Sequence, residues 1–264
     1  TYVKEASDYG VALVDREGQI FGFPSNSGVN TIDRLCGTAI RAVPDLAPGD
    51  VIATNDPWMG TGHVYDINVL RPVFRNGTLI AHVLSITHLP DIGGAGFGTT
   101  ATEIYHEGLR LPLCKLLREG EVDQYLLELI AANVRVPEQV IGDVMANVAC
   151  NEVGGRQVLE FMDEYDLDDL SEISAAIRGQ SERMTREAIV NIKDGTYRNS
   201  IRIEGIDAPI TLACRVDVEG DSVRLPGANR PGVVKLRYGW SDAPFLNLFG
   251  KNGLPAIPFE RAID

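Results

Sequence analysis

The chain has 264 residues, of which 44% are hydrophobic and 23% charged, the composition of an ordinary globular protein. Its 37 acidic and 24 basic residues give a net charge of −13, which opposes binding to nucleic-acid backbones and anionic membranes. Polar residues, glycines and prolines interrupt every uncharged stretch, so we expect no transmembrane helix. Four widely spaced cysteines without a CxxC motif indicate free thiols in a cytoplasmic protein rather than a zinc ribbon or a disulfide scaffold.

The N-terminal part alternates between apolar and polar residues in the manner of strands. Residues 9–23 predict a hairpin with an acidic glycine-containing turn, and residues 30–43 predict a helix that ends at Pro44. Further strands are predicted at residues 51–54, 66–74 and 79–87, the last two joined by the turn signal Asn76-Gly77. The glycine-rich stretch 91–102 predicts no regular element, and we expect it to be a mobile or closely approaching loop over a site.

Beyond residue 120 the apolar residues recur at helical intervals. This pattern predicts three antiparallel helices at residues 122–134, 137–165 and 170–192, and alternation returns at residues 201–225. The fold class is therefore expected to be α+β. We expect three regions, which are a β-rich one at residues 1–120, a helical one at 121–193 and a β-rich segment with an atypical tail at 194–264.

The histidines are the most informative residues, because all four lie between positions 63 and 106. His63 and Asp66 are three residues apart, and so are His88 and Asp91. A strand places residues at this spacing on opposite faces, so each pair needs a turn, which the neighbouring glycines and prolines make plausible. Two imidazoles with carboxylates suit Zn²⁺, Mn²⁺ or Fe²⁺ and predict a metal site. Alternatively, each aspartate only fixes a histidine tautomer or caps a turn.

Three further polar residues lie in the same region of the sequence. Asp56 in the stretch Asn55-Asp56-Pro57-Trp58 is a candidate site residue that would join the metal ligands or orient a histidine. Its spacing alone favours an Asx-type turn. His82 is expected in mid-strand and His106 lies in a Tyr-His-Glu run, so both are interpreted as structural or surface residues.

Several segments together resemble the hydantoinase B/oxoprolinase family. The resemblance covers about residues 5 to 221 and is carried by residues 55–66, 88–94, 102–112, 132–138 and 194–197. The family also includes subunits of acetone- and acetophenone-type carboxylases. The last part of the chain, about residues 222–264, resembles instead the end of sialate O-acetylesterases, but it contains none of their catalytic residues, so no esterase activity is expected.

The resemblance implies a metal-bearing B-type subunit of an ATP-dependent cyclic-amide hydrolase. A separate A-type subunit would bind ATP and phosphorylate the cyclic amide or ketone substrate. The implied metal ligands are Asp8, His63, Asp66 and His88, while Asp91 would lie just outside the ligands or carry protons. The alternatives are a subunit of an ATP-dependent carboxylase, or a non-catalytic subunit in which the histidines and aspartates only brace loops.

The sequence also departs from the family pattern. The order Gly60-Thr61-Gly62-His63 replaces the usual Gly-Gly-Thr-His, and Thr87 precedes His88 where the family often has paired histidines. Family members are longer than this chain, which also starts without methionine. We therefore expect a truncated, fused or misassembled chain.

Overall fold

The computed structural model describes residues 8–24, 36–60, 62–98, 100–204 and 208–225, and the backbone of residues 33–35, 235–238 and 259–262. The chain divides into two compact units, the first comprising residues 1–176 and 241–244 and the second residues 177–240 and 245–264. Helices and antiparallel sheets are both present, which confirms the predicted α+β class. Within these described residues, no helix combines the length and the apolar character that crossing a membrane requires.

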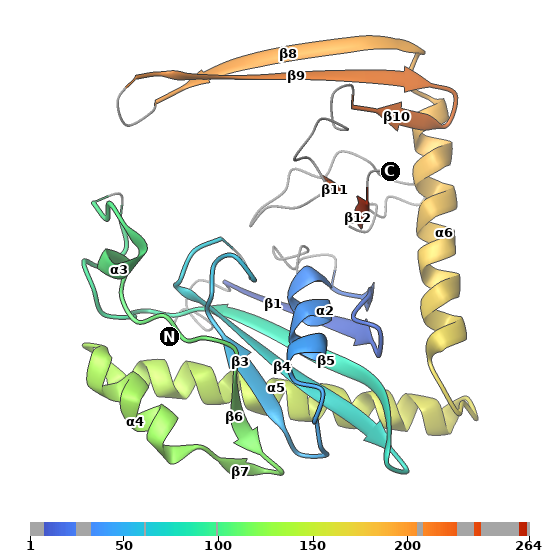
Figure 1. Cartoon of the computed structure of the whole chain (residues 1–264). Coiled ribbons are helices and arrows are strands. Elements are labelled where there is room, and N and C mark those ends of the chain that lie inside the picture. Colours follow the sequence, from blue (N-terminus) through green and yellow to red (C-terminus); the bar gives the residue numbers. More distant parts are fainter. Residues whose placement is uncertain are drawn as a thin grey trace. The chain divides into compact units, whose positions relative to one another are not determined.

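The first unit is built on a seven-stranded sheet in which every neighbouring pair of strands is antiparallel (Figure 1). The strand order is β2-β1-β5-β4-β3-β6-β7. The strands are β1 (Tyr9–Asp15), β2 (Ile20–Gly22), β3 (Val51–Thr54), β4 (Asp66–Arg75), β5 (Thr78–His88), β6 (Cys114–Arg118) and β7 (Glu121–Val122). The first five were predicted from alternation, whereas β6 and β7 were not.

Five helices are described: α2 (Asp33–Ala42), α3 (Ile104–Glu107), α4 (Gln124–Asn133), α5 (Pro137–Glu164) and α6 (Ser171–Val190). The three helices predicted beyond residue 120 are confirmed as α4, α5 and α6. The side chain of Asp123 caps α4 by accepting a hydrogen bond from the N–H of Leu126 at 3.0 Å. The predicted start of the helix before Pro44, at residue 30, lies outside the described residues.

Both faces of the sheet are covered by helices (Figure 1). On one face, Cys36 and Ala39 of α2 pack among buried residues of the strands such as Leu84. On the other face, α5 places Val140, Val144 and Val148 in one cluster with buried residues of β3 and β4. Because both faces of the sheet are covered, most residues of β4 and β5 are buried, including polar ones such as Asn68 and His82.

Polar side chains also lie in the interface between α5 and the sheet. Asn147 accepts a hydrogen bond from the hydroxyl of Thr87 at 2.8 Å, and Asn151 donates to the carbonyl of Val69 at 2.8 Å. Both asparagines are at most 4% exposed. Because hydrogen bonds are directional, these two bonds in a buried interface fix the position of α5 along the strands. The end of β5, where His88 follows Thr87, is therefore held in register.

The second unit contains the later part of α6 and two small sheets. The three-stranded sheet has the order β10-β9-β8 and consists of β8 (Gly195–Ile203), β9 (Ile210–Glu219) and β10 (Ser222–Arg224). Strands are thus present where alternation predicted them at residues 201–225, although β8 begins earlier, at Gly195. The backbone of β11 (Lys235–Tyr238) pairs antiparallel with that of β12 (Phe259–Ala262).

His82 gives the first unit a predictable pH dependence. The ring is fully buried in the middle of β5, as expected for a structural histidine, and its Nδ1 lies 3.2 Å from the carbonyl oxygen of Asp15. Burial lowers the pKa of His82 from 6.5 to about 4. Between these values the unfolded chain binds a proton that the folded chain does not. Stability is thus lost as the pH falls from 6.5 to 4, by about 3 kcal/mol.

Urea unfolding at pH 7.0 and pH 4.5 checks this expectation. The variant His82→Gln keeps an amide donor but does not titrate, so its free energy of unfolding should fall less with pH than that of the wild type. The matched variant His106→Gln alters an exposed histidine and should behave as the wild type does. Identical pH dependence in wild type and His82→Gln would contradict the assignment.

Candidate metal centre

Three of the predicted metal ligands converge at one end of the β4–β5 hairpin. His63 lies in the turn before β4, Asp66 is the first residue of β4 and His88 is the last residue of β5. One potential ligand atom from each of these three residues lies within 4.8 Å of those from the other two. Nδ1 of His88 is 3.0 Å from Oδ1 of Asp66, and Nε2 of His63 is 3.5 Å from Oδ2 of the same carboxylate. Asp66 is therefore the centre of the cluster.

The strand register decides that Asp66 meets His88. Near the tight turn, Phe74 is opposite Leu79, but Val73 is opposite Ala81, so Ile80 is one extra residue in β5. This β-bulge shifts every later pair by one position and places Asp66 opposite His88. In a regular hairpin Asp66 would be opposite Thr87, whose side chain faces α5. The bulge thus creates the cluster.

The turn that carries His63 is held by Asn55, which is 2% exposed. Its amide group donates to the carbonyls of Val64 at 2.7 Å and Leu109 at 2.9 Å, and its oxygen accepts from the N–H of Leu111 at 2.6 Å. Sequence reasoning missed this role and assigned Asn55 only to a turn. A polar residue directly after a buried strand was the available signal. These bonds tie the approach to β4 to a segment more than fifty residues later.

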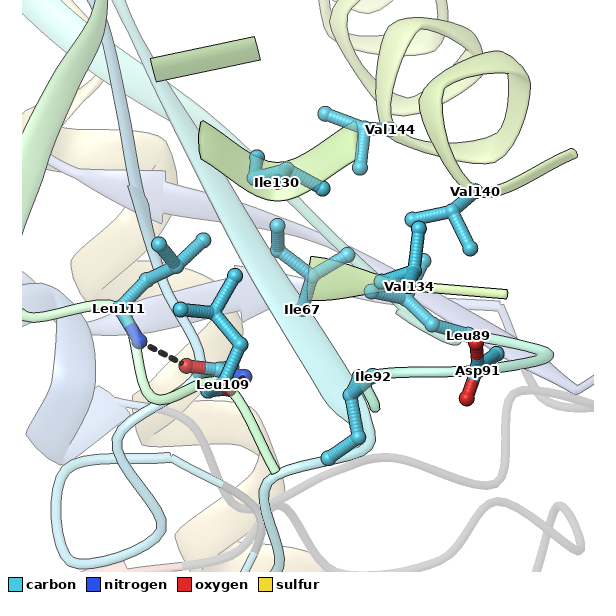
Figure 2. A pocket seen from close by; sticks show the side chains of 11 residues that line it. Ile67, Leu89, Asp91, Ile92, Leu109, Leu111, Ile130, Val134, Val140 and Val144 are labelled. Carbon is cyan, nitrogen blue, oxygen red and sulfur yellow. Dashed lines mark hydrogen bonds between the residues drawn. The ribbon is translucent and has the colours of Figure 1, made fainter. Parts of the chain in front are cut away.

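Figure 2 shows an apolar cavity beside Asn55, with the hydrogen bond from the N–H of Leu111 to Asn55 drawn as a dashed line. Branched aliphatic side chains from β4 and the two helices α4 and α5 surround it, including Ile67, Ile130 and Val144. Its volume is about 10 Å³, which is room for about one water molecule. This cavity is too small for a substrate.

Asp8, the fourth ligand implied by the family resemblance, lies beside the cluster. Its Oδ2 is 4.0 Å from Nδ1 of His88, and its carbonyl accepts a hydrogen bond from the N–H of His88 at 3.2 Å. The side chain is 56% exposed, in contrast to the buried Asp66.

Asp91 makes a different set of contacts. Its Oδ1 accepts hydrogen bonds from the guanidinium of Arg135 at 2.7 Å and from the N–H of Gly93 at 3.0 Å, and its Oδ2 accepts from the N–H of Arg135. Burial alone would raise the pKa of Asp91, but these hydrogen bonds and the positive charge outweigh it and hold the pKa below its ordinary value. These contacts favour a role in fixing the loop after β5 over one in proton transfer.

Asp56 forms the Asx-type turn that its spacing favours. Its Oδ1 accepts from the N–H of Trp58 at 3.0 Å, while its carbonyl accepts from Met59 and Gly60. His106 is exposed and pairs with Glu103 at 3.0 Å. Neither Asp56 nor His106 belongs to the ligand cluster found among the described residues.

The cluster fits a divalent cation by its chemistry. Two imidazoles and a carboxylate are the donors that Zn²⁺, Mn²⁺ and Fe²⁺ accept. Nδ1 of His63 is buried and has no hydrogen-bond partner among the described residues. The ring of His88 is stacked on Tyr65 with centroids 5.3 Å apart, and Phe97 meets it edge-on at 5.1 Å. The glycine-rich stretch at residues 91–102 thus approaches the site closely, which is one of the two behaviours expected for it.

The chain is similar to several known proteins. A family described as hydantoinase B/oxoprolinase matches residues 1–229. Caprolactamase subunit beta of Pseudomonas jessenii is 30% identical over 219 residues, which cover 81% of this chain and 36% of that protein. The 5-oxoprolinase of Saccharomyces cerevisiae is 29% identical over 282 residues, which cover 100% of this chain and 21% of that protein.

Two solved structures share the fold. The crystal structure of the ATP-dependent caprolactamase from Pseudomonas jessenii has a TM-score of 0.72 at 29% identity, covering 82% of this chain and 39% of that one. The nucleotide-free acetone carboxylase has a TM-score of 0.71 at 19% identity, covering 84% and 33%, and this likeness shows the fold alone. The chain thus spans between about a fifth and two fifths of the length of these relatives.

Proposed function

The chain belongs to the hydantoinase B/oxoprolinase family, and on this premise we propose that it is the metal-bearing B-type component of an ATP-dependent cyclic-amide hydrolase. The observation that carries the proposal is the convergence of His63, Asp66 and His88 within 4.8 Å at the end of one hairpin. The names of two relatives, an ATP-dependent caprolactamase and a 5-oxoprolinase, supply the reaction class.

The proposed metal site comprises His63, Asp66 and His88, with Asp8 as a further ligand. A divalent cation bound there would supply Lewis acidity and lower the pKa of bound water. The chain's own residues supply orientation. Asp66 contacts both imidazoles, and the stacked ring of Tyr65 limits rotation of His88. Since fewer than five protein ligands are proposed, coordination positions would remain for water and substrate.

ATP chemistry is assigned to a partner. The relative from Pseudomonas jessenii is named as a beta subunit, which supports a multi-subunit enzyme. The glycine-rich stretch between residues 93 and 98 is not followed by the Lys-Ser/Thr of a Walker A loop. We therefore propose that an A-type subunit binds ATP and phosphorylates the cyclic amide, and that this chain completes ring opening.

The test is ATP consumption by the chain produced together with an A-type partner. We expect ATP hydrolysis that depends on a cyclic amide, assayed with 5-oxoproline, hydantoin and ε-caprolactam. His88→Ala should abolish it, whereas the matched variant His106→Ala should retain it. ATP use that requires acetone and bicarbonate instead would establish a carboxylase. Full activity of His88→Ala would show that the cluster only braces loops.

A further inference from the structure

The side chain of Phe97 contacts His88 of the cluster and is also exposed to solvent. Its ring centroid lies 5.1 Å from that of His88 and 5.2 Å from that of Tyr65, in both cases nearly perpendicular. The residue is nevertheless 72% exposed. One part of the ring therefore packs against the cluster, and the rest presents an apolar surface directly beside the candidate ligands.

The loop that carries Phe97 is fixed at its base. A side chain at Gly93 would collide with the carbonyl oxygen of Asn133, and the N–H of Ala95 donates to the carbonyl of His106 at 2.8 Å. The guanidinium of Arg135 donates to the carbonyl oxygen of Gly94. These contacts join the loop to α3 and to the end of α4. Phe97 is thus presented from a braced segment.

Part of the candidate site is exposed to solvent, as Phe97 is. The side chain of His63 is 32% exposed, and that of Asp8 is 56% exposed. A molecule that reaches the cluster there meets polar ligand atoms and, against His88, the apolar ring of Phe97. A compound with a polar amide and an apolar body matches both surfaces, because each part then contacts a surface of its own kind.

We propose that Phe97 is a specificity-determining residue that packs against the ring methylenes of the cyclic-amide substrate. This inference rests on the proposed function, and it narrows the substrate class to lactams whose ring is largely hydrocarbon. Larger rings should gain more from the contact, because each additional methylene that leaves water adds to the affinity.

The test compares two lactams that differ in ring size, 2-pyrrolidinone and ε-caprolactam, by ligand-observed NMR titration of the purified, Zn²⁺-supplemented chain. We expect Phe97→Ala to weaken binding of ε-caprolactam about 10-fold and that of 2-pyrrolidinone about 3-fold or less. Phe97→Leu should retain most of the preference for the larger ring. Phe161→Ala is the matched control, because Phe161 on α5 is also partly exposed but packs against Tyr165, the residue that follows this helix.

Metal content measured in the same samples separates this inference from the proposed function. Lactam binding that depends on Phe97 in a chain without metal would overturn the proposed metal site and leave the specificity assignment standing. The role of Phe97 would be overturned if metal-loaded wild type bound both lactams equally or bound neither. It would also be overturned if Phe97→Ala weakened the binding of both lactams by the same factor.

Discussion

Replacing Asp66 by alanine should lower the affinity of the chain for a divalent cation by about 100-fold or more, and Asp66→Asn should lower it by about 10-fold or more. The reason is that Asp66 contacts both histidines, at 3.0 Å and 3.5 Å, and supplies the buried negative charge of the cluster. Asparagine keeps the shape but offers a hard cation only a neutral oxygen. Competition titration against a chromophoric chelator measures the affinity.

The matched control for Asp66→Asn is Asp56→Asn. Asp56 is another aspartate of the same segment, but its carboxylate accepts a backbone hydrogen bond within a turn. Its replacement should leave the metal affinity within about 3-fold of the wild type. Circular dichroism of each variant verifies that the fold is retained. Equal affinities of wild type and Asp66→Asn would remove Asp66 from the ligand set.

Asn55→Ala should destabilise the first unit by about 3 to 5 kcal/mol. The substitution removes three hydrogen bonds, to the carbonyls of buried Val64 and half-buried Leu109 and to the N–H of buried Leu111, and leaves these groups without this partner. Each such buried group costs about 1–3 kcal/mol. Because Val64 directly follows His63, the metal affinity should fall as well. Urea unfolding followed by circular dichroism measures the change in the free energy of unfolding.

Asn133→Ala is the matched control for Asn55→Ala. Asn133 is exposed at the end of α4 and donates one local hydrogen bond to the carbonyl of Leu129 at 2.8 Å. Asn133→Ala should therefore change the free energy of unfolding by about 0.5 kcal/mol or less. If Asn55→Ala were as stable as Asn133→Ala, the hydrogen bonds of Asn55 would not stabilise the turn before β4 as proposed.

Much of the fold was predictable because its signals are local. The Asn76-Gly77 turn has positive φ at both residues, as this hairpin signal requires, and it joins β4 to β5. Helical periodicity and Pro137 at the first turn located α5. The short strand β6 was missed because Lys115 breaks its apolar pattern. The structure explains that lysine by an ion pair with buried Asp50 at 2.8 Å.

The candidate site was predicted less completely, because part of it depends on pairing between strands. His63 and Asp66 are close in sequence, and the turn between them was expected. The second copy of the spacing was less informative, since Asp91 contacts Arg135 and the carboxylate beside His88 is that of Asp66. That contact depends on the β-bulge at Ile80, for which the sequence contains no clear signal.

Anomalous diffraction from crystals grown with Zn²⁺, recorded on both sides of the zinc absorption edge, tests the metal site most directly. The account predicts one strong peak bonded to His63, Asp66 and His88, at distances of about 2.0–2.2 Å to nitrogen and oxygen. A well-ordered cluster without a peak, or a peak held by other residues, would contradict it.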